Sequence, residues 1–322
     1  MKLTIIVPVY NAEKYIDQTI NTLVHQEGLD NYEILAIIDA NCTDRSEKIL
    51  TAYAAAYPII KVIKEGDTNQ AQKMNRGLLL AKGDYVAECD ADDFVSLRMY
   101  EQLLNRAEGK ADAVRCGWFG VWDDSDLFGR GFIQPNYPVK VTEENVIVDM
   151  RTADLYEQKM VLAKQCALFA GIFRREFLLE NEIFWRTDGQ NFEDTAVEFK
   201  IRSCARDYRF VNEPLYYYRR GNEGSGTATI KDDHAIIEQY DEIERWNDSH
   251  GFNFMPVMNM VRFYSYNWAQ GRSQDPKETG KMYAKSIALH SAPKEAFDNI
   301  KEFYTYESVR EYGVKLWEEE RI

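Results

Sequence analysis

Three aspartates stand together in the segment Asp90-Ala91-Asp92-Asp93. Asp90 and Asp92 are two positions apart, so in an extended segment both side chains point to the same side. Two carboxylates held that close repel each other unless a cation lies between them, and hard oxygen ligands favour Mn²⁺ or Mg²⁺. The spacing therefore predicts a divalent-metal site. The simpler alternative is a turn that caps a helix beginning near Ser96, because aspartate is common in both roles.

The strands that must position these carboxylates follow from the hydrophobic pattern. Short apolar runs at residues 3–7, 34–38, 59–63 and 85–89 alternate with segments whose apolar residues recur at helical spacing. The runs are continuous rather than alternating, which is typical of strands buried on both faces. We therefore expect a parallel sheet covered by helices, with the aspartates just past its fourth strand.

Polar and turn-forming residues predict where the first three helices begin. The first is expected to start at a cap at Asn11, and the second near Asp44, with Glu47 completing a capping-box-like pair. The third is expected between residues 69 and 82, with Gly83 as its stop signal.

In such sheets a ligand binds outside the carboxyl ends of the strands. Asp39 stands at the end of the second run, where it can accept hydrogen bonds from a ribose or a base, or can anchor its own loop. Tyr10 follows the first run and offers an aromatic face for a base, with an ordinary half-buried turn residue as the alternative.

Two further pairs of residues carry charge that catalysis could use. Glu193 and Asp194 form a second carboxylate pair, which is suited to a general base or to a capped, salt-bridged surface position. Arg219 and Arg220 follow three tyrosines and could clamp a leaving diphosphate, or could pack in solvent on the tyrosine rings.

Composition and missing motifs exclude several classes of protein. The net charge of −14 disfavours nucleic acid as a partner, because that binding needs a basic face. The five cysteines are widely spaced without a CxxC pair, so we expect neither a disulfide framework nor a zinc site. No GxGxxG or GxxxxGK[ST] motif cradles a phosphate, so a metal must supply the positive charge.

These motifs together identify a family: the sequence resembles glycosyltransferase family 2, inverting enzymes of the GT-A fold, and is similar to bacterial polysaccharide-assembly members. The resemblance covers roughly the first 230 residues. Its sharpest pieces are Ile6-Val7-Pro8-Val9-Tyr10-Asn11-Ala12-Glu13, Asp39 with Thr43-Asp44, Met74-Asn75-Arg76-Gly77, Ala81-Lys82-Gly83-Asp84-Tyr85 and Asp90-Ala91-Asp92-Asp93. It continues more loosely through Phe173-Arg174-Arg175-Glu176-Phe177-Leu178, Phe192-Glu193-Asp194-Thr195 and Leu215-Tyr216-Tyr217-Tyr218-Arg219.

The resemblance implies a role for each matching position. Asp90 and Asp92 would form the DXD motif that holds a metal on the donor's diphosphate, and Asp194 would be the catalytic base. The metal, with Arg219 or Arg220, would stabilise the leaving nucleoside diphosphate. The residues expected around the nucleotide are Pro8, Tyr10, Asp39, Asn75, Asp90, Ala91 and Asp92.

The chain departs from the family pattern at two places. Ala40 stands where many members carry an aspartate that contacts uracil, which leaves the identity of the base open. Members often carry a histidine shortly after the Tyr-Arg segment, but this chain continues Arg219-Arg220-Gly221-Asn222. A third protein ligand to the metal is therefore not assigned.

We therefore expect an α/β fold, a GT-A type Rossmann-like mixed sheet flanked by helices, in a nucleotide-sugar-binding catalytic domain at residues 1–230. Residues 231–322 are expected to form a helical C-terminal region. The predicted reaction moves a sugar from a nucleoside-diphosphate sugar, a UDP-sugar in the leading hypothesis, to a saccharide or lipid-linked saccharide in cell-surface polysaccharide biosynthesis. The acceptor rests on analogy alone.

Two other functions and the location complete the expectations. A catalytically silent nucleotide-binding or scaffolding homologue would explain Ala40 and the missing histidine. A sugar nucleotidyltransferase is less favoured, because residues 8–13 supply no Gly-rich basic loop. The chain opens directly on an apolar strand and has no apolar run of about 20 residues, so it is expected in the cytoplasm. Peripheral association with the inner face of the membrane is left open.

Overall fold

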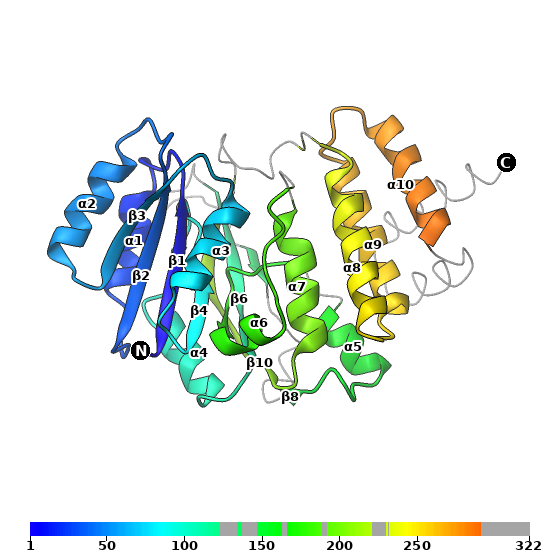
Figure 1. Ribbon diagram of the computed structural model, residues 1–322, viewed down its shortest axis with the longest axis horizontal. Helices are drawn as coiled ribbons and strands as arrows, with labels where there is room; N and C mark the ends of the chain where they lie inside the picture. Colours follow the sequence, from blue (N-terminus) through cyan, green and yellow to red (C-terminus); the bar gives the residue numbers. More distant parts are fainter. Residues whose placement is uncertain are drawn as a thin grey trace. The chain divides into compact units, whose positions relative to one another are not determined.

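The computed structural model describes residues 1–122, 134–136, 147–162, 166–188, 192–220, 230 and 232–290 (Figure 1). Contacts within the chain define two compact units. Unit 1 comprises Met1–Thr152, Cys166–Thr187 and Cys204–Asn222. Unit 2 comprises Ala153–Gln165, Asp188–Ser203 and Glu223–Ile322. The chain therefore crosses between the units several times.

The predicted parallel strands are confirmed and form one half of the sheet in unit 1. They are β1 (Leu3–Val9), β2 (Tyr32–Asp39), β3 (Ile60–Glu65) and β4 (Tyr85–Glu88). β1 pairs in parallel with β2 and β4, and β2 pairs in parallel with β3. β1 and β2 are buried along their whole length, as their continuous apolar runs predict.

The rest of the sheet makes it mixed rather than parallel, with the strand order β3-β2-β1-β4-β9-β6-β10-β5. β9 (Gly171–Arg174) runs antiparallel to both of its neighbours, β4 and β6 (Ala113–Trp122), so β4 and β6 point the same way. β10 (Tyr208–Arg220) is parallel to β6. The carboxyl ends of β1, β2, β4, β6 and β10 therefore lie at one edge. Three short strands pair antiparallel to β6 or β10: β5 (Phe94–Val95), β7 (Gln134–Asn136) and β8 (Ile147–Val148).

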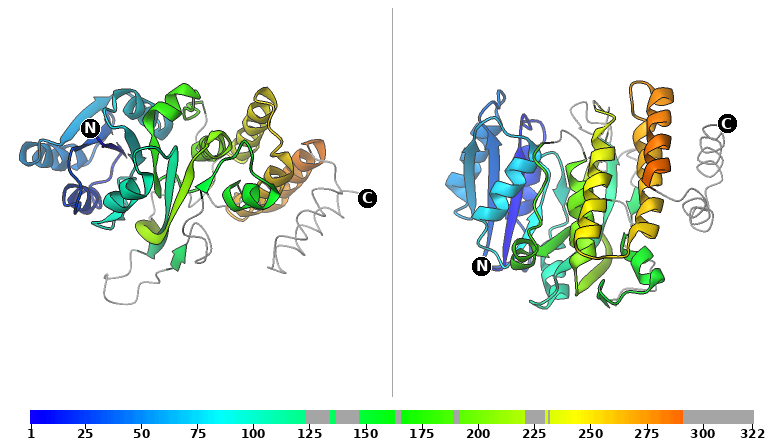
Figure 2. Two further views of the ribbon diagram at one scale, coloured as in Figure 1. Left: turned by 90° about the horizontal axis from the view of Figure 1, so that it is seen from below. Right: turned by 45° about the vertical axis from the view of Figure 1, so that its right-hand side comes forward.

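Helices cover both faces of the sheet, as Figures 1 and 2 show for α1 (Ile16–Val24) and α3 (Gln70–Leu80). Alternate residues of β1 point to opposite faces. Ile5 packs in the core cluster with α1, whereas Ile6 lies against Gly77 of α3. The other helices of unit 1 are α2 (Ser46–Ala56), α4 (Met99–Ala107) and α6 (Arg175–Glu180).

The predicted start of the first helix is wrong. The second helix, α2, begins near Asp44 as predicted, at Ser46, but without the expected capping pair. α1 begins at Ile16, because Asn11 adopts a positive φ of 45° and its Oδ1 accepts the main-chain N–H of Thr43. Asp44 accepts the N–H of Ser46, but Glu47 forms an ion pair with Lys64 and completes no capping box. A turn at Asn11, hydrogen-bonded to the loop after β2, therefore replaces the expected cap.

The third predicted helix is confirmed at both ends. Asn69 is the N-cap of α3, and its side chain accepts the N–H of Gln72 in a capping box. The helix ends at Leu80 with Ala81 as its C-cap, so Gly83, the predicted stop signal, lies just beyond the end of the helix. Gly83 is needed because a Cβ at this position would lie 2.4 Å from the main-chain N of Thr4. Close approach to β1, rather than helix termination, explains this glycine.

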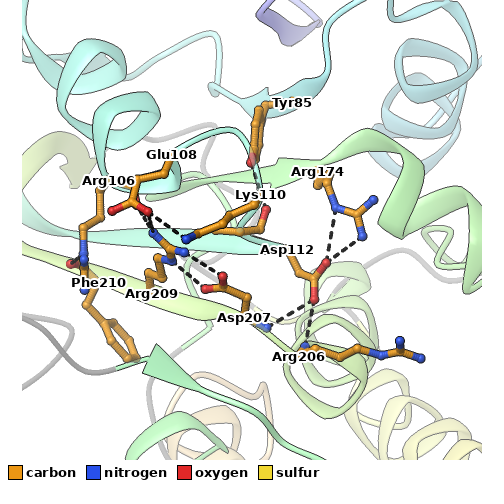
Figure 3. A network of polar contacts seen from close by, with 11 residues as sticks. Tyr85, Arg106, Glu108, Lys110, Asp112, Arg174, Arg206, Asp207, Arg209 and Phe210 are labelled. Atoms are coloured by element: carbon orange, nitrogen blue, oxygen red, sulfur yellow. Dashed lines mark hydrogen bonds and ion pairs between the residues drawn. The ribbon is translucent and has the colours of Figure 1, made fainter.

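A network of hydrogen bonds and ion pairs joins the amino ends of β4, β6 and β10 to Arg174, the last residue of β9 (Figure 3). Asp112 accepts hydrogen bonds from the guanidinium of Arg174 at 2.7 Å and from the N–H of Arg206 at 2.8 Å. The buried guanidinium of Arg209 pairs with Asp207 and Glu108, which raise its pKa above the ordinary value. These charges stabilise the edge of the sheet opposite to the one where Asp90 lies.

Unit 2 is helical among the residues that the structure describes. Within the segment expected to be helical, residues 231–322, the structure describes α8 (Ala235–Ser249), α9 (Met255–Gln270) and α10 (Pro276–His290). Residues 291–322 of that expected segment lie outside the described residues. These three helices share the unit with α5 (Leu155–Leu162) and with α7, assigned to Glu193–Cys204. None of the described helices is both long and apolar enough to cross a membrane.

We predict that Gly83→Ala lowers the free energy of unfolding by about 3 kcal/mol, because its Cβ would overlap main-chain atoms that cannot move aside. Gly66→Ala is the matched control, since no atom lies within 4 Å of its added Cβ. Urea unfolding of both variants provides the measurement. Equal midpoints for the two variants would show that the sheet tolerates the extra atom.

Candidate active site

The loop Asp90–Asp93 leaves the carboxyl end of β4 and turns around a buried carboxylate. Asp93 is 1% exposed, and its Oδ2 accepts the hydroxyl of Tyr216 at 2.7 Å. Its Oδ1 accepts the main-chain N–H of Arg219, also at 2.7 Å. The Tyr216 hydroxyl accepts the N–H of Asp90 at 3.1 Å. Tyr216 thus connects the first and last residues of the loop.

Burial sets the electrostatics of this pair. Desolvation, followed by the charges of Asp90 and Asp92, raises the pKa of Asp93 well above its usual range. Burial and the nearby carboxylate of Asp93 likewise raise the pKa of Tyr216. Tyr216 therefore keeps its proton and remains a hydrogen-bond donor. The side chain of Asp93 accepts its hydrogen bonds from Tyr216 and Arg219 inside the protein.

Helix α1 and strand β10 hold the outside of the same loop. Thr19 donates its hydroxyl to the carbonyl oxygen of Asp93 at 2.6 Å, and the carbonyl of Ala91 lies 2.9 Å from it. Arg219 donates Nε to the carbonyl oxygen of Asp92 and Nη2 to Gln18, both at 2.7 Å. The structure therefore gives Arg219 a place in the loop's support.

Asp90 and Asp92 are both partly exposed, in contrast to Asp93. Gln70, the first residue of α3, donates to Asp90 Oδ1 and to Glu88 Oε1, each at 3.1 Å. Sequence reasoning missed Gln70 and Glu88. The available signal was the position of Glu88, which is two residues before Asp90 and hence on the same side of the strand.

Asp39 lies at the end of β2 and is 3% exposed. Its carboxylate accepts the N–H groups of Asn41 at 2.8 Å and Thr68 at 3.0 Å, and pairs with Lys73 Nζ at 3.4 Å. Burial alone would raise the pKa of Asp39, but these N–H groups and Lys73 hold it below its usual range. Of the two predicted tasks, loop anchoring is observed. A nucleoside contact stays a prediction.

Pro8 and Tyr10 lie at the carboxyl end of β1, which is two residues longer than predicted. Pro8 is buried within the strand, opposite Ile37 of β2. Tyr10 follows the strand and is 58% exposed, one of the few large hydrophobic side chains at the surface among the described residues. Such a ring is available for stacking.

The side chain of Asn75, in α3, is hydrogen-bonded to the main chain of Trp185. Its side-chain amide donates to the carbonyl of Trp185 at 2.7 Å and accepts the N–H of Trp185 at 2.8 Å. Gly77, from the same motif, approaches Ile6 so closely that a Cβ would lie 2.5 Å from it. The motif therefore packs α3 in place, and the predicted nucleotide contact of Asn75 stays a prediction.

Glu193 and Asp194 open α7 in unit 2. Burial, with the adjacent charge of Asp194, raises the pKa of Glu193 to about 7. A carboxyl group with this pKa exchanges its proton near neutral pH. The assignment of Asp194 as base stays a prediction.

Two of the three aspartates in the loop can supply oxygen ligands to a divalent ion. Among the described residues, no group of three or more His, Cys, Asp or Glu side chains could hold a metal. Asp90 and Asp92 supply two hard oxygen ligands, and Asp93 is engaged by Tyr216 and Arg219. Two carboxylates with remaining positions for phosphate and water are the usual protein share of a Mg²⁺ site.

Residues 4–178 match the family model described as Glycosyl transferase family 2. This match covers more than half of the 322 residues. The chain belongs to glycosyltransferase family 2. The resemblance seen in the motifs is thereby confirmed.

Several curated relatives of this family 2 chain are glycosyltransferases. The uncharacterized glycosyltransferase EpsJ of Bacillus subtilis is 24% identical over 321 residues, which is 96% of this chain and 85% of EpsJ. The uncharacterized glycosyltransferase YibD of Escherichia coli is 36% identical over 67% of this chain and 61% of its own. The minor teichoic acid biosynthesis protein GgaB of Bacillus subtilis is 34% identical over 69% of this chain and 23% of its own. The relatives of the chain thus include a protein described as acting in minor teichoic acid biosynthesis.

Solved structures of similar shape confirm the GT-A fold. Staphylococcus aureus TarS 1–349 in complex with UDP-GlcNAc has a TM-score of 0.69 at 17% identity, covering 97% of this chain and 91% of that one. The Pyrobaculum calidifontis mannosyltransferase PcManGT, in complex with GDP-Man and Mn²⁺, has a TM-score of 0.58 at 15% identity, covering 98% and 84%.

We predict that Tyr216→Phe lowers the free energy of unfolding by about 1–3 kcal/mol, because it removes a donor from buried Asp93 and an acceptor from the Asp90 N–H. Tyr10→Phe, at an exposed ring, is the control and should leave stability unchanged. Urea unfolding measures both. If Tyr216→Phe and Tyr10→Phe both unfolded with the wild-type free energy, the buried hydrogen bond would not hold the loop.

We also predict a pH dependence of stability from Glu193. Its pKa is raised from 4.5 to about 7 in the folded protein, so the folded state binds this proton more tightly. The contribution is complete below pH 4.5 and is lost as the pH rises through 7. Melting temperatures at pH 5 and pH 8 should therefore differ less for Glu193→Gln than for the wild type.

Glu278→Gln, at an exposed position in the same unit, is the control for this pH comparison. It should keep the full wild-type difference between the two pH values. A Glu193→Gln protein with the wild-type difference would exclude Glu193 as its source.

Proposed function

We propose that this protein transfers one sugar from a UDP-sugar to a saccharide or lipid-linked saccharide acceptor, with inversion at the anomeric carbon. The observation that carries the proposal is the different burial of the three aspartates in the loop after β4. Asp93 is buried and tied to Tyr216, whereas Asp90 and Asp92 are partly exposed at the carboxyl edge of the sheet. That edge is where ligands bind in sheets of this kind.

In the proposed reaction Asp90 and Asp92 would hold a divalent ion, Mn²⁺ or Mg²⁺. When bound, such an ion would supply positive charge for the donor's diphosphate. The Tyr216 hydroxyl keeps Asp90 in place through its main-chain N–H. Gln70 donates to the Asp90 carboxylate and so fixes its orientation.

The nucleoside is proposed to lie past β1 and β2, near Pro8, Tyr10 and Asp39. The exposed ring of Tyr10 supports this placement, since a base can stack on it. UDP is favoured by the likeness to TarS, whose complex contains UDP-GlcNAc. PcManGT, of similar fold, is described with GDP-Man, so the fold alone leaves the base undecided.

Asp194 is proposed to act as the catalytic base. It takes the proton of the acceptor hydroxyl, whose oxygen forms a bond to the anomeric carbon. The bond from that carbon to the diphosphate oxygen breaks, and the nucleoside diphosphate leaves with the electron pair. The neighbouring Glu193, with a pKa of about 7, supports a proton-exchanging role for this segment.

The proposed setting is cell-surface polysaccharide assembly in the cytoplasm, at the inner face of the membrane. The similarity to GgaB, described as a minor teichoic acid biosynthesis protein, supports it. A lipid-linked or polymeric acceptor suits an enzyme that works at that surface.

Asp92→Ala and Asp194→Asn are expected to lower transfer by roughly 100-fold or more, because each removes a group that acts on the reacting atoms. Asp30→Asn, at an exposed carboxylate, is the control and should keep full activity. A panel of UDP-sugars with Mn²⁺ and saccharide acceptors, read by UDP release, measures all four proteins. Wild-type protein that binds UDP but turns over no member of the panel would support the silent homologue instead.

UDP binding is expected to weaken about tenfold or more on adding EDTA, since two carboxylates without a cation repel the diphosphate. Titration calorimetry with and without Mn²⁺ measures this. Binding of equal strength under both conditions would remove the metal role from Asp90 and Asp92.

A further inference from the structure

Arg220, the last residue of β10, lies inside a frame of aromatic rings. Its guanidinium carbon is 5.3 Å from the ring centre of Trp118, 5.5 Å from that of Trp122 and 5.7 Å from that of Tyr218. Rings at this distance attract a cation through their faces and hold it in one orientation. We call these three rings with Arg220 the Arg220 frame.

The strand register explains how the frame forms. β6 lies beside β10, with Gly120 opposite Tyr218 and Trp122 opposite Arg220. A Cβ at Gly120 would lie 3.3 Å from Arg220 Nε, so the absence of a side chain lets the guanidinium lie across β6. Gly120 thus leaves the space that the Arg220 guanidinium needs.

Arg220 differs from Arg219 in its polar partners. Arg219 donates to Asp92 and Gln18, whereas no described residue forms a hydrogen bond or ion pair with the Arg220 side chain. Its Nε is buried without a partner. The rings orient the guanidinium without neutralising it, in a chain whose net charge is −14. The frame therefore presents a fixed positive charge that suits an anion.

The frame lies at the same edge of the sheet as the Asp90 loop, because β4, β6 and β10 point the same way. Tyr216, whose hydroxyl contacts the Asp90 N–H, is four residues before Arg220 on the same face, about 13 Å along the strand. β1 and β2 lie on the other side of β4. The frame is therefore separated from the proposed nucleoside position by the loop itself.

We propose that the Arg220 frame binds an anionic group, a phosphate or a carboxylate, of the saccharide acceptor. This inference rests on the proposed function, which supplies the positions of the nucleotide donor and of the acceptor. A guanidinium pairs with either group through two parallel hydrogen bonds. The aromatic rings supply flat apolar surfaces for the carbon skeleton that bears the anion. The enzyme would thus favour charged acceptors over neutral ones.

Binding of glucose 6-phosphate, in EDTA and without nucleotide, tests the frame apart from the metal loop. Fluorescence of Trp118 and Trp122 should change on binding, because both rings border the guanidinium. Wild-type protein should bind glucose 6-phosphate saturably and glucose not at all. Arg220→Gln should weaken binding about tenfold or more, and Arg220→Lys by less, since it keeps the charge.

Arg45→Gln, at an exposed arginine, is the matched control and should bind as the wild type does. UDP binding with Mn²⁺ should stay within about twofold for Arg220→Gln, because the inference assigns Arg220 to the acceptor and not to the diphosphate that the family resemblance implies. Failure of wild-type protein to bind glucose 6-phosphate, or unchanged binding by Arg220→Gln, would overturn the inference. A parallel loss of UDP binding would assign Arg220 to the diphosphate instead. Failure of wild-type protein to bind UDP would count against the proposed function, and the sugar-phosphate result would stand apart from it.

Discussion

The hydrogen bond between Tyr216 and buried Asp93 is the contact on which the candidate site depends. It joins the loop before β5 to the middle of β10, across 123 residues of sequence, and it determines which aspartates of the loop face solvent. A carboxylate without solvent is costly unless donors surround it, and the N–H of Arg219 supplies the second one. Asp90 and Asp92 remain outward because Asp93 is held inward.

The parallel half of the fold could be predicted from sequence, because its strands are buried on both faces and leave continuous apolar runs. Residues 3–7 and 34–38 mark β1 and β2 to within two residues at each end. The start of the first helix was less predictable. Asn11 has the composition of a cap, but its positive φ and its bond to Thr43 depend on a loop 32 residues away. Local propensity contains no information about such a partner.

The same limit applies to the site. The pattern Asp90-Ala91-Asp92 indicates ligands for a metal because its spacing alone sets the direction of the side chains. The hydrogen bonds from Gln70 and Tyr216 to Asp90 exist only in the folded chain. The difference between Arg219 and Arg220 likewise arises only because β10 lies beside β6 and the loop after β4. Sequence adjacency made the two arginines look equivalent, whereas neighbouring strand residues face opposite sides.

The two edges of the sheet have separate tasks, and this separation has a consequence for how the chain can change. Asp112 and Arg209 tie strands together at the amino ends, far along the strands from the residues that would choose a substrate. Substitutions at Tyr10, Trp122 or Arg220 leave that network intact. Laboratory evolution toward new sugars should therefore vary positions such as these three, and keep the amino-edge network and the Tyr216–Asp93 pair constant.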